Sequence, residues 1–251
     1  MPEAAPATKE TLYAEGHELY RTGRVDSAAV ILARALELDS AYVPALMDMA
    51  MLQYEHAGIA AADSPVRLRA QKDARNYFAR AERAGVTDAA MYDRLCELSV
   101  ALEDSVGFLR YAQEGVRRYP YDRQVFNLGL AYYDNSQFQS AIQTMKDAIA
   151  RFPESNYIGG YYRVLGRSYI RVDRDQTAER TLYAGLKAVD GRLGSFTQSD
   201  EEASAREARA RLMEERVAML VSLRRLHKIY KATDKLKEVE RQLRQAGYDL
   251  E

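Results

Sequence analysis

The feature that most limits the fold is a small residue that recurs at a fixed spacing. Three pairs of small residues lie twelve positions apart: Gly16 and Ala28, Gly129 and Ala141, and Gly166 and Ala178. Each pair joins two segments whose apolar residues follow a helical period, and small side chains allow two helix backbones to approach closely. The 251-residue chain is therefore predicted to be an all-α stack of antiparallel helix pairs.

The clearest unit runs from Lys9 to Tyr42. Its first helix is predicted to stop at the glycine signal of Thr22-Gly23, and Asp26 then begins a second helix. Two helices in about thirty-four residues resemble the tetratricopeptide-repeat (TPR) family, and the resemblance spans nearly the whole chain. It implies a right-handed α-α superhelix, a TPR solenoid of about six irregular helix pairs from a bacterial source.

Repeat two departs from this spacing. An insertion at about residues 58–69 delays its second helix, which is predicted to begin at Pro65, after Ser64, and to extend to Ala84. In repeat three, Phe108 stands where a small residue is expected, so that helix pair is predicted to be splayed. The expected organisation is a disordered lead at 1–8, repeats one to five at 9–190, a loop at 191–199, and a capping region at 200–251.

The capping region is predicted to contain a long penultimate helix. Ser199 and Glu202 have the spacing of a capping box, and no Gly or Pro interrupts the chain from there to Ala232. Such a helix would be about 50 Å long at 1.5 Å per residue. A last helix, Asp234 to Gln245, presents Leu236, Val239, Leu243 and Ala246 as its inner face.

Catalytic and metal-binding patterns are missing from the sequence. The single cysteine, Cys96, excludes an intrachain disulfide, and three histidines are few for a metal centre. His17-Glu18 resembles the start of a zinc-protease motif, but the second ligand position holds Arg21. Cys96 and His227 fall at predicted packing positions. We therefore expect no enzyme activity, no metal and no cofactor.

In the TPR family, the first helix of each pair lines the concave face, where partners bind as extended peptides or helices. The resemblance therefore predicts a partner-binding surface with aromatic and methionine anchors in the earlier repeats and cations in the last two. Its expected residues are Tyr13, Tyr20, Met51, Tyr54, Phe126, Asn127, Tyr133, Arg163, Arg167, Arg171, Arg224, Arg225, Lys228 and Lys231.

The charge is distributed unevenly along the chain. Before Ser155 the chain has 17 basic and 22 acidic residues, and from there on it has 19 basic and 15 acidic. Seven cations on the first helices of the last two pairs predict a groove that prefers an acidic protein segment. Glutamates at 163, 167 and 171 are then expected to abolish binding without unfolding. The alternative is that these cations are paired with acids on adjacent helices, and that the aromatic residues pack between repeats.

The predicted function is that of a non-enzymatic protein-interaction scaffold. The family's clamp for chaperone tails is absent, because only Asn127 matches it while Asp93 and Glu97 replace its partners. One alternative is a subunit of a bacterial envelope-assembly or transporter-associated complex, since the segment 151–157 resembles repeat junctions of outer-membrane-assembly lipoproteins. Another is a small-ligand carrier or enzyme that uses the groove. Self-association through the long helix stays open, and no specific nucleic acid is expected.

No apolar run is long enough for a transmembrane helix, and the first residues lack the pattern of a signal peptide. The sequence leaves the compartment open between a soluble protein of the cytoplasm and, if a leader is missing from this chain, one of the bacterial periplasm or cell envelope.

Overall fold

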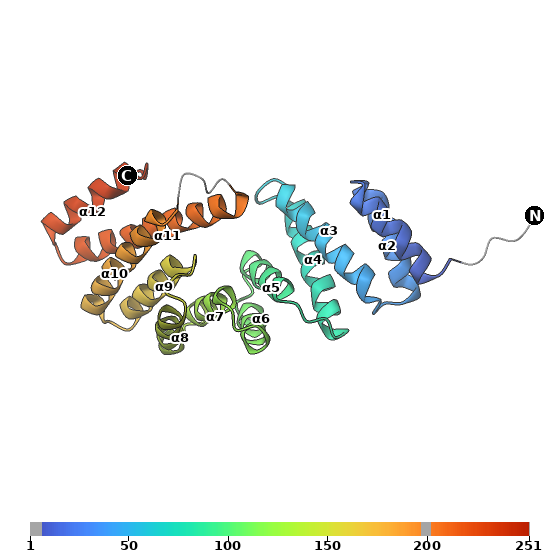
Figure 1. Cartoon of the computed structure of the whole chain (residues 1–251), viewed down its shortest axis with the longest axis horizontal. Coiled ribbons are helices and arrows are strands. Elements are labelled where there is room, and N and C mark those ends of the chain that lie inside the picture. Colours follow the sequence, from blue (N-terminus) through green and yellow to red (C-terminus); the bar gives the residue numbers. More distant parts are fainter. Residues whose placement is uncertain (1–6, 197–201, 251) are drawn as a thin grey trace, which may run out of the picture. The chain divides into compact units, whose positions relative to one another are not determined.

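The computed structural model describes residues 7–196 and 202–250, and within these ranges the chain forms twelve helices and no strand (Figure 1). The prediction of an all-α fold built from six successive helix pairs is confirmed. The helices are α1 (Lys9–Arg21), α2 (Val25–Leu38), α3 (Val43–Ile59), α4 (Pro65–Arg83), α5 (Ala89–Ala101), α6 (Ser105–Arg118), α7 (Asp122–Asp134), α8 (Phe138–Arg151), α9 (Ile158–Arg171), α10 (Asp175–Gly194), α11 (Ala203–Ile229) and α12 (Thr233–Gln245).

These helices divide into two compact units that meet in sequence within α6. Unit 1 is Met1–Glu114 and unit 2 is Gly115–Glu251. The sequence predicted a single array over residues 9–190 and placed no boundary there. Repeat spacing shows which helices form a pair, but it does not show which neighbouring pairs share a core, so this division was not visible in the sequence.

Small residues bring the two helices of a pair into close contact, as predicted. A Cβ atom on Gly16 would lie 2.8 Å from Leu32 Cγ, and one on Gly166 would lie 2.6 Å from Leu182 Cδ2. A Cβ atom on Gly129 would likewise overlap the end of Met145. In all three pairs the residue contacted lies sixteen positions after the glycine. The glycines therefore set the distance between helices within a pair.

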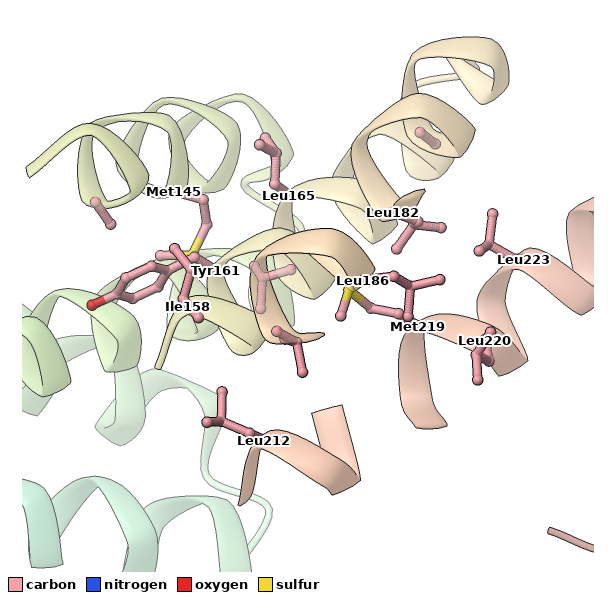
Figure 2. Close-up of a cluster of buried hydrophobic side chains, with 14 of the residues drawn as sticks. Met145, Ile158, Tyr161, Leu165, Leu182, Leu186, Leu212, Met219, Leu220 and Leu223 are labelled. Atoms are coloured by element: carbon pink, nitrogen blue, oxygen red, sulfur yellow. The ribbon is translucent and has the colours of Figure 1, made fainter. Parts of the chain in front are cut away.

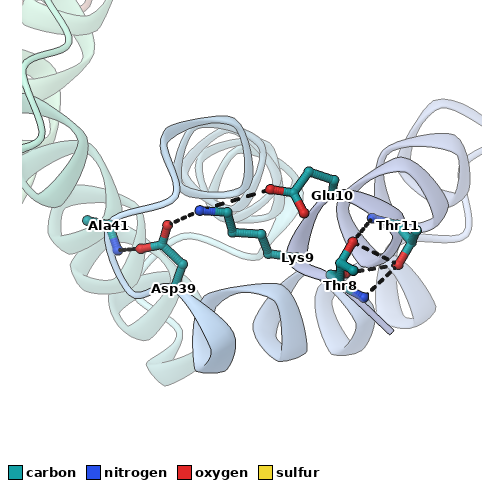
Figure 3. A network of polar contacts seen from close by, with 6 residues as sticks. All are labelled: Thr8, Lys9, Glu10, Thr11, Asp39 and Ala41. Atoms are coloured by element: carbon teal, nitrogen blue, oxygen red, sulfur yellow. Dashed lines mark hydrogen bonds and ion pairs between the residues drawn. The ribbon is translucent and has the colours of Figure 1, made fainter. Parts of the chain in front are cut away.

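Polar caps fix the first helix of unit 1 (Figure 3). Thr8 and Thr11 form a capping box, in which each side chain accepts a hydrogen bond from the backbone of the other. Lys9 Nζ lies 2.6 Å from Asp39 Oδ2, and the same carboxylate accepts a hydrogen bond from the backbone N–H of Ala41. The ion pair joins the start of α1 to the end of α2.

Helix α4 confirms the long helix predicted for repeat two. The Ser64 side chain accepts a hydrogen bond from the Arg67 backbone N–H at 3.1 Å, and Pro65 occupies the first turn. The helix ends at Arg83, with Ala84 as its C-cap. Part of the predicted insertion is thus helical, because α3 continues to Ile59 and only residues 60–64 connect α3 with α4.

The core of unit 2 is formed by apolar side chains from α7 to α12, and Figure 2 shows those of α8 to α11. Met145, Tyr161, Leu182, Met219 and Leu220 are fully buried in it. The Tyr161 hydroxyl donates a hydrogen bond of 2.9 Å to the Asp122 carbonyl oxygen, and burial raises the pKa of this tyrosine. These contacts hold α9 and α11, whose outer faces form the site described below.

Two boundaries near the C-terminus differ from prediction. The loop expected from Gly191 begins later, because α10 continues to Gly194, with Val189 buried and Leu193 packed against the core. The long penultimate helix is confirmed as α11, with 27 residues, but it ends at Ile229 rather than Ala232. Ser199 of the predicted capping box lies outside the described residues, as does most of the predicted lead, and Glu202 makes no side-chain cap.

Candidate protein-interaction surface

A groove of about 680 Å³ lies between α9 and α11 in unit 2. Its floor is apolar, and the C-terminal end of α12 closes one side, where a turn with positive φ at Gly247 places Tyr248. We call it the α9–α11 groove. Its lining residues are Arg163, Arg167, Met213, Glu214, Val217, Ala218, Val221, Ser222, Arg225, Ala246 and Tyr248. Ala246, predicted to lie on the inner face of the last helix, is exposed there.

The apolar floor exists because α11 has apolar residues on two faces. Leu220 and Leu223 are fully buried in the core of unit 2. Met213, Val217 and Val221 follow one another every four residues and form a second stripe that lines the groove. Sequence analysis missed this stripe as a site, although its four-residue spacing was a visible signal.

Arg163 is not a free cation, contrary to the predicted basic groove. Its guanidinium forms a bidentate ion pair with Glu215 on α11, in which Nη2 and Oε1 are 3.1 Å apart. The two side chains are only 16% and 14% exposed. Arg163 is paired because α11, the first helix of the following pair, places Glu215 opposite it. A glutamate at position 163 would face Glu215. Replacing Arg163, Arg167 and Arg171 by glutamate, which was expected to leave the fold intact, would therefore break a half-buried ion pair.

Arg167 and Arg171 lie over aromatic rings. The Arg167 guanidinium carbon is 4.6 Å from the centre of the Tyr133 ring, and that of Arg171 is 4.8 Å from the Phe138 ring. Partial burial raises the pKa of the Asp134 carboxyl, and the nearby charge of Arg167 opposes this shift. Arg167 therefore lies on the groove beside α7, whereas Arg171 is one turn further along and does not line the groove.

The cations of α11 are divided between its faces. Arg224 pairs with Glu240 of α12 at 3.0 Å and also donates to the Leu250 carbonyl oxygen. Arg225, one residue later and about 100° around the helix, is exposed and lines the groove. In the described part of the chain Arg225 has no ion pair. Lys228 and Lys231 are exposed and lie outside the groove, so only three of the seven predicted cations come together there.

The predicted aromatic anchor of α7 packs inside unit 2. The Phe126 ring stacks on Tyr157 with centroids 5.5 Å apart, and a Cβ atom on Gly160 would lie 2.5 Å from it. This is the alternative in which aromatic residues fill the space between neighbouring repeats. Asn127 is half-buried on the same helix and does not line the α9–α11 groove.

The predicted residues of unit 1 lie on α1 and α3 and are held by contacts within that unit. The Tyr13 ring meets the Tyr42 ring edge-on at 5.7 Å. The Tyr54 hydroxyl donates a hydrogen bond to the Glu97 carboxylate, and Met51 is half-buried one turn away.

Tyr20 also bonds to a carboxylate. Burial, followed by the hydrogen bond to Glu55, raises the pKa of the Tyr20 hydroxyl. His17 Nδ1 lies 2.7 Å from Asp48 Oδ2 on the same face. His17, Tyr20 and Tyr54 thus each contact an acid, and Arg94 lies 5.7 Å from the centre of the Tyr54 ring on the same surface.

The two residues predicted to be packed, Cys96 and His227, are both buried at 2% exposure. His227 Nε2 lies 3.1 Å from Glu179 Oε1, and Lys235 Nζ lies 2.7 Å from the same oxygen. Within residues 7–196 and 202–250, no three His, Cys, Asp or Glu side chains are placed to hold a metal ion. Among the described helices, none is long and apolar enough to cross a membrane.

No protein-family model matches the chain, and no curated protein matches it in sequence. Solved structures do match its fold. YrrB, described as a TPR protein with an unusual peptide-binding site, has a TM-score of 0.57 and 18% identity, with 80% of this chain and 91% of that chain covered. MamA has a TM-score of 0.58 and 16% identity, with coverages of 75% and 96%.

A third structure, MamA from residue 41 to its end, comes from Desulfovibrio magneticus RS-1. It has a TM-score of 0.55 and 19% identity, with 74% of this chain and 98% of that chain covered. At such low identities the shared property is the path of the backbone, and it agrees with the close helix pairs described above. The chain therefore has the TPR-like helical-repeat fold.

Proposed function

We propose that this protein is a non-enzymatic interaction scaffold, and that its α9–α11 groove binds a protein segment with both apolar and acidic side chains. The observation that carries the proposal is an apolar floor bordered by Arg167 and Arg225, neither of which forms an ion pair within residues 7–196 and 202–250. A segment bound there would bury Val217 and Val221 and place a carboxylate near Arg167 or Arg225.

The charge balance of the groove favours a carboxylate only modestly. Glu215 neutralises Arg163, the exposed Glu214 also lines the groove, and the Asp134 carboxyl lies near Arg167. The groove therefore supplies two arginines for specific contacts rather than a broad positive field. Binding is expected to depend on where the acid lies in the segment as well as on its charge.

Arg167 is well suited to such a contact because its side chain is already held. Stacking on Tyr133 restricts the guanidinium before a partner arrives. A planar guanidinium that is oriented in advance loses less conformational entropy when it binds a carboxylate with two hydrogen bonds.

The acidic preference is assigned to unit 2 alone. In unit 1, Tyr20 and Tyr54 contact carboxylates, so these two residues have no cation of their own to offer an acidic segment. We include Tyr13, Tyr20, Met51 and Tyr54 as contacts for a different part of the partner. The printed description of YrrB mentions a peptide-binding site, which supports the proposal only in that this fold can hold one.

The proposal can be tested by selecting a random peptide library on the full chain and measuring the affinity of the enriched peptides by fluorescence anisotropy. We expect enriched peptides to combine large apolar residues with Asp or Glu. The double variant Arg167→Ala/Arg225→Ala should bind them at least about tenfold more weakly, because each lost charged hydrogen bond is worth roughly 1.5–3 kcal/mol.

The matched control is Arg209→Ala, which removes an exposed arginine from the same helix α11 but outside the groove. It should bind like the wild type. Enriched peptides without acidic residues, or equal loss of affinity in the control, would contradict the proposed site.

A further inference from the structure

Unit 1 contains a second groove, on a surface that the proposed function does not use. It has a volume of about 710 Å³ and lies among the start of α2, the second half of α3 and the first half of α4. We call it the α2–α4 groove. Buried Leu52 forms part of its floor, while Val25, Ile59 and Val66 line its exposed edge.

The groove follows from the unequal lengths of neighbouring helices. Helices α3 and α4 have 17 and 19 residues, whereas α1 and α2 have 13 and 14. The last turn of α3 and the first turn of α4 therefore have no counterpart in the preceding pair. Their apolar side chains lack a neighbour, so Ile59 is 86% exposed and Val66 is 53% exposed.

Such exposure is unfavourable in water unless a partner covers it. Val25, at 38% exposure, lies on the same groove, so these are neighbouring residues rather than isolated apolar ones. Clustered exposed apolar side chains around a hollow are typical of an interaction site.

The charges around the groove indicate which partner fits. Three carboxylates line it, those of Asp26, Glu55 and Asp73, against one arginine, Arg69. Arg69 lies 3.7 Å from Asp73 and so offsets that carboxylate. Glu55 accepts a hydrogen bond from the neutral Tyr20 hydroxyl, which leaves its charge uncancelled. The groove is thus apolar with a negative rim, the opposite of the arginine-bordered groove in unit 2.

We propose that the α2–α4 groove binds an amphipathic helix of a protein partner, with leucine-like side chains on one face and lysine or arginine beside them. The apolar face would cover Ile59 and Val66, and the cations would meet Asp26 and Glu55. The site does not depend on the α9–α11 groove, so either proposal can fail without the other.

The test uses the full chain and three labelled synthetic peptides of equal length, measured by fluorescence anisotropy. One is a Leu/Lys amphipathic helix, the second has Glu in place of every Lys, and the third has Ser in place of every Leu. The comparison of charges uses the Arg167→Ala/Arg225→Ala chain, which lacks the two arginines of the α9–α11 groove that would attract a Leu/Glu peptide. On this chain only the Leu/Lys peptide should bind tightly, and added salt should weaken its binding. Equal binding of the Leu/Glu peptide to this variant would overturn the proposed partner chemistry.

Variants then locate the binding site. Ile59→Ser/Val66→Ser should weaken the Leu/Lys peptide at least about tenfold, because burial of these side chains is lost. The control Val30→Ser/Val106→Ser removes two other exposed valines of unit 1, 62% and 74% exposed, outside the groove. It should bind like the wild type, and equal affinities for both double variants would overturn the proposal.

The acidic rim has its own variant. Asp26→Asn/Glu55→Gln should also weaken binding of the Leu/Lys peptide, whereas Glu37→Gln, at an exposed acid of α2 outside the groove, should not. Sedimentation velocity completes the test. A dimer of the wild type that Ile59→Ser/Val66→Ser separates would identify a second copy as the occupant and would refute the peptide partner.

Discussion

The close approach of helices at Gly166 predicts that alanine changes the free energy of unfolding in opposite directions at two glycines of unit 2. Gly166 lies within α9 and faces Leu182, whereas Gly191 lies within α10 with nothing within 4 Å of an added Cβ. We expect Gly166→Ala to lower the free energy of unfolding and Gly191→Ala to raise it.

The magnitudes follow from two opposing effects. Replacing glycine by alanine inside a helix gains up to about 1 kcal/mol in helix propensity. At Gly166 the new Cβ would lie 2.6 and 2.7 Å from Leu182 Cδ2 and Cγ. Leu182 is fully buried, and the Cγ branch point is not the flexible end of its side chain. Overpacking of this kind costs about 1–3 kcal/mol, so subtracting a gain of about 1 kcal/mol leaves an expected net loss of up to about 2 kcal/mol.

Gly129→Ala is an intermediate case. The added methyl group would overlap the terminal methyl of Met145, a flexible side chain that can change its conformation. The expected order of stability is therefore Gly191→Ala, wild type, Gly129→Ala and Gly166→Ala, from highest to lowest.

Urea unfolding followed by far-ultraviolet circular dichroism measures this order without a tryptophan, which the chain lacks. All three variants change unit 2 alone, so they are compared in the same transition. A Gly166→Ala protein as stable as the wild type would refute the role of this glycine in setting the distance between α9 and α10.

Three other variants test polar contacts. Arg163→Ala should lower the free energy of unfolding by about 2 kcal/mol in urea, because Glu215 is left half-buried without its partner; a change below about 0.5 kcal/mol would contradict a stabilising pair. The Glu179 carboxyl has a lowered pKa because it accepts hydrogen bonds, first from the lysine of α12 and then from the buried histidine of α11. The stability it adds is therefore present above pH about 4.5 and is lost on acidification, and Glu179→Gln should show a smaller loss of stability between pH 7 and pH 3. Thr8→Ala should cost about 1 kcal/mol in thermal unfolding because it removes the side-chain acceptor for the Thr11 N–H, and an unchanged melting temperature would exclude this role.

Most of the fold was predictable because it depends on local sequence signals. Glycine and alanine spacing located the helix pairs, and Ser64-Pro65 located the start of α4. The break expected at Gly191 was wrong by four residues, since glycine lowers helix propensity but burial of Val189 and packing of Leu193 hold the helix together. The boundary between units was missed because it depends on contacts between pairs.

The candidate site was predictable only in part. Sequence periodicity placed Arg163 and Arg167 on one face of α9, and both line the α9–α11 groove. It could not show that Arg224 turns toward α12, because this depends on where the terminal helix packs. The apolar floor was missed for a related reason: the structure shows that α11 has a second apolar face, with Met213, Val217 and Val221 lining the groove.

The three arginines of α9 show why charge alone does not define a binding site. They are four residues apart and equivalent in the sequence, yet each meets a different neighbour: Arg163 a carboxylate of α11, Arg167 the ring of Tyr133, and Arg171 the ring of Phe138. A carboxylate cancels the charge, whereas an aromatic ring orients the guanidinium and leaves its hydrogen-bond donors available. Under the proposed function, partner specificity in unit 2 would depend on which helix faces each arginine, and Arg167, which is oriented by Tyr133 and lines the groove, would be the arginine of α9 best able to select a partner.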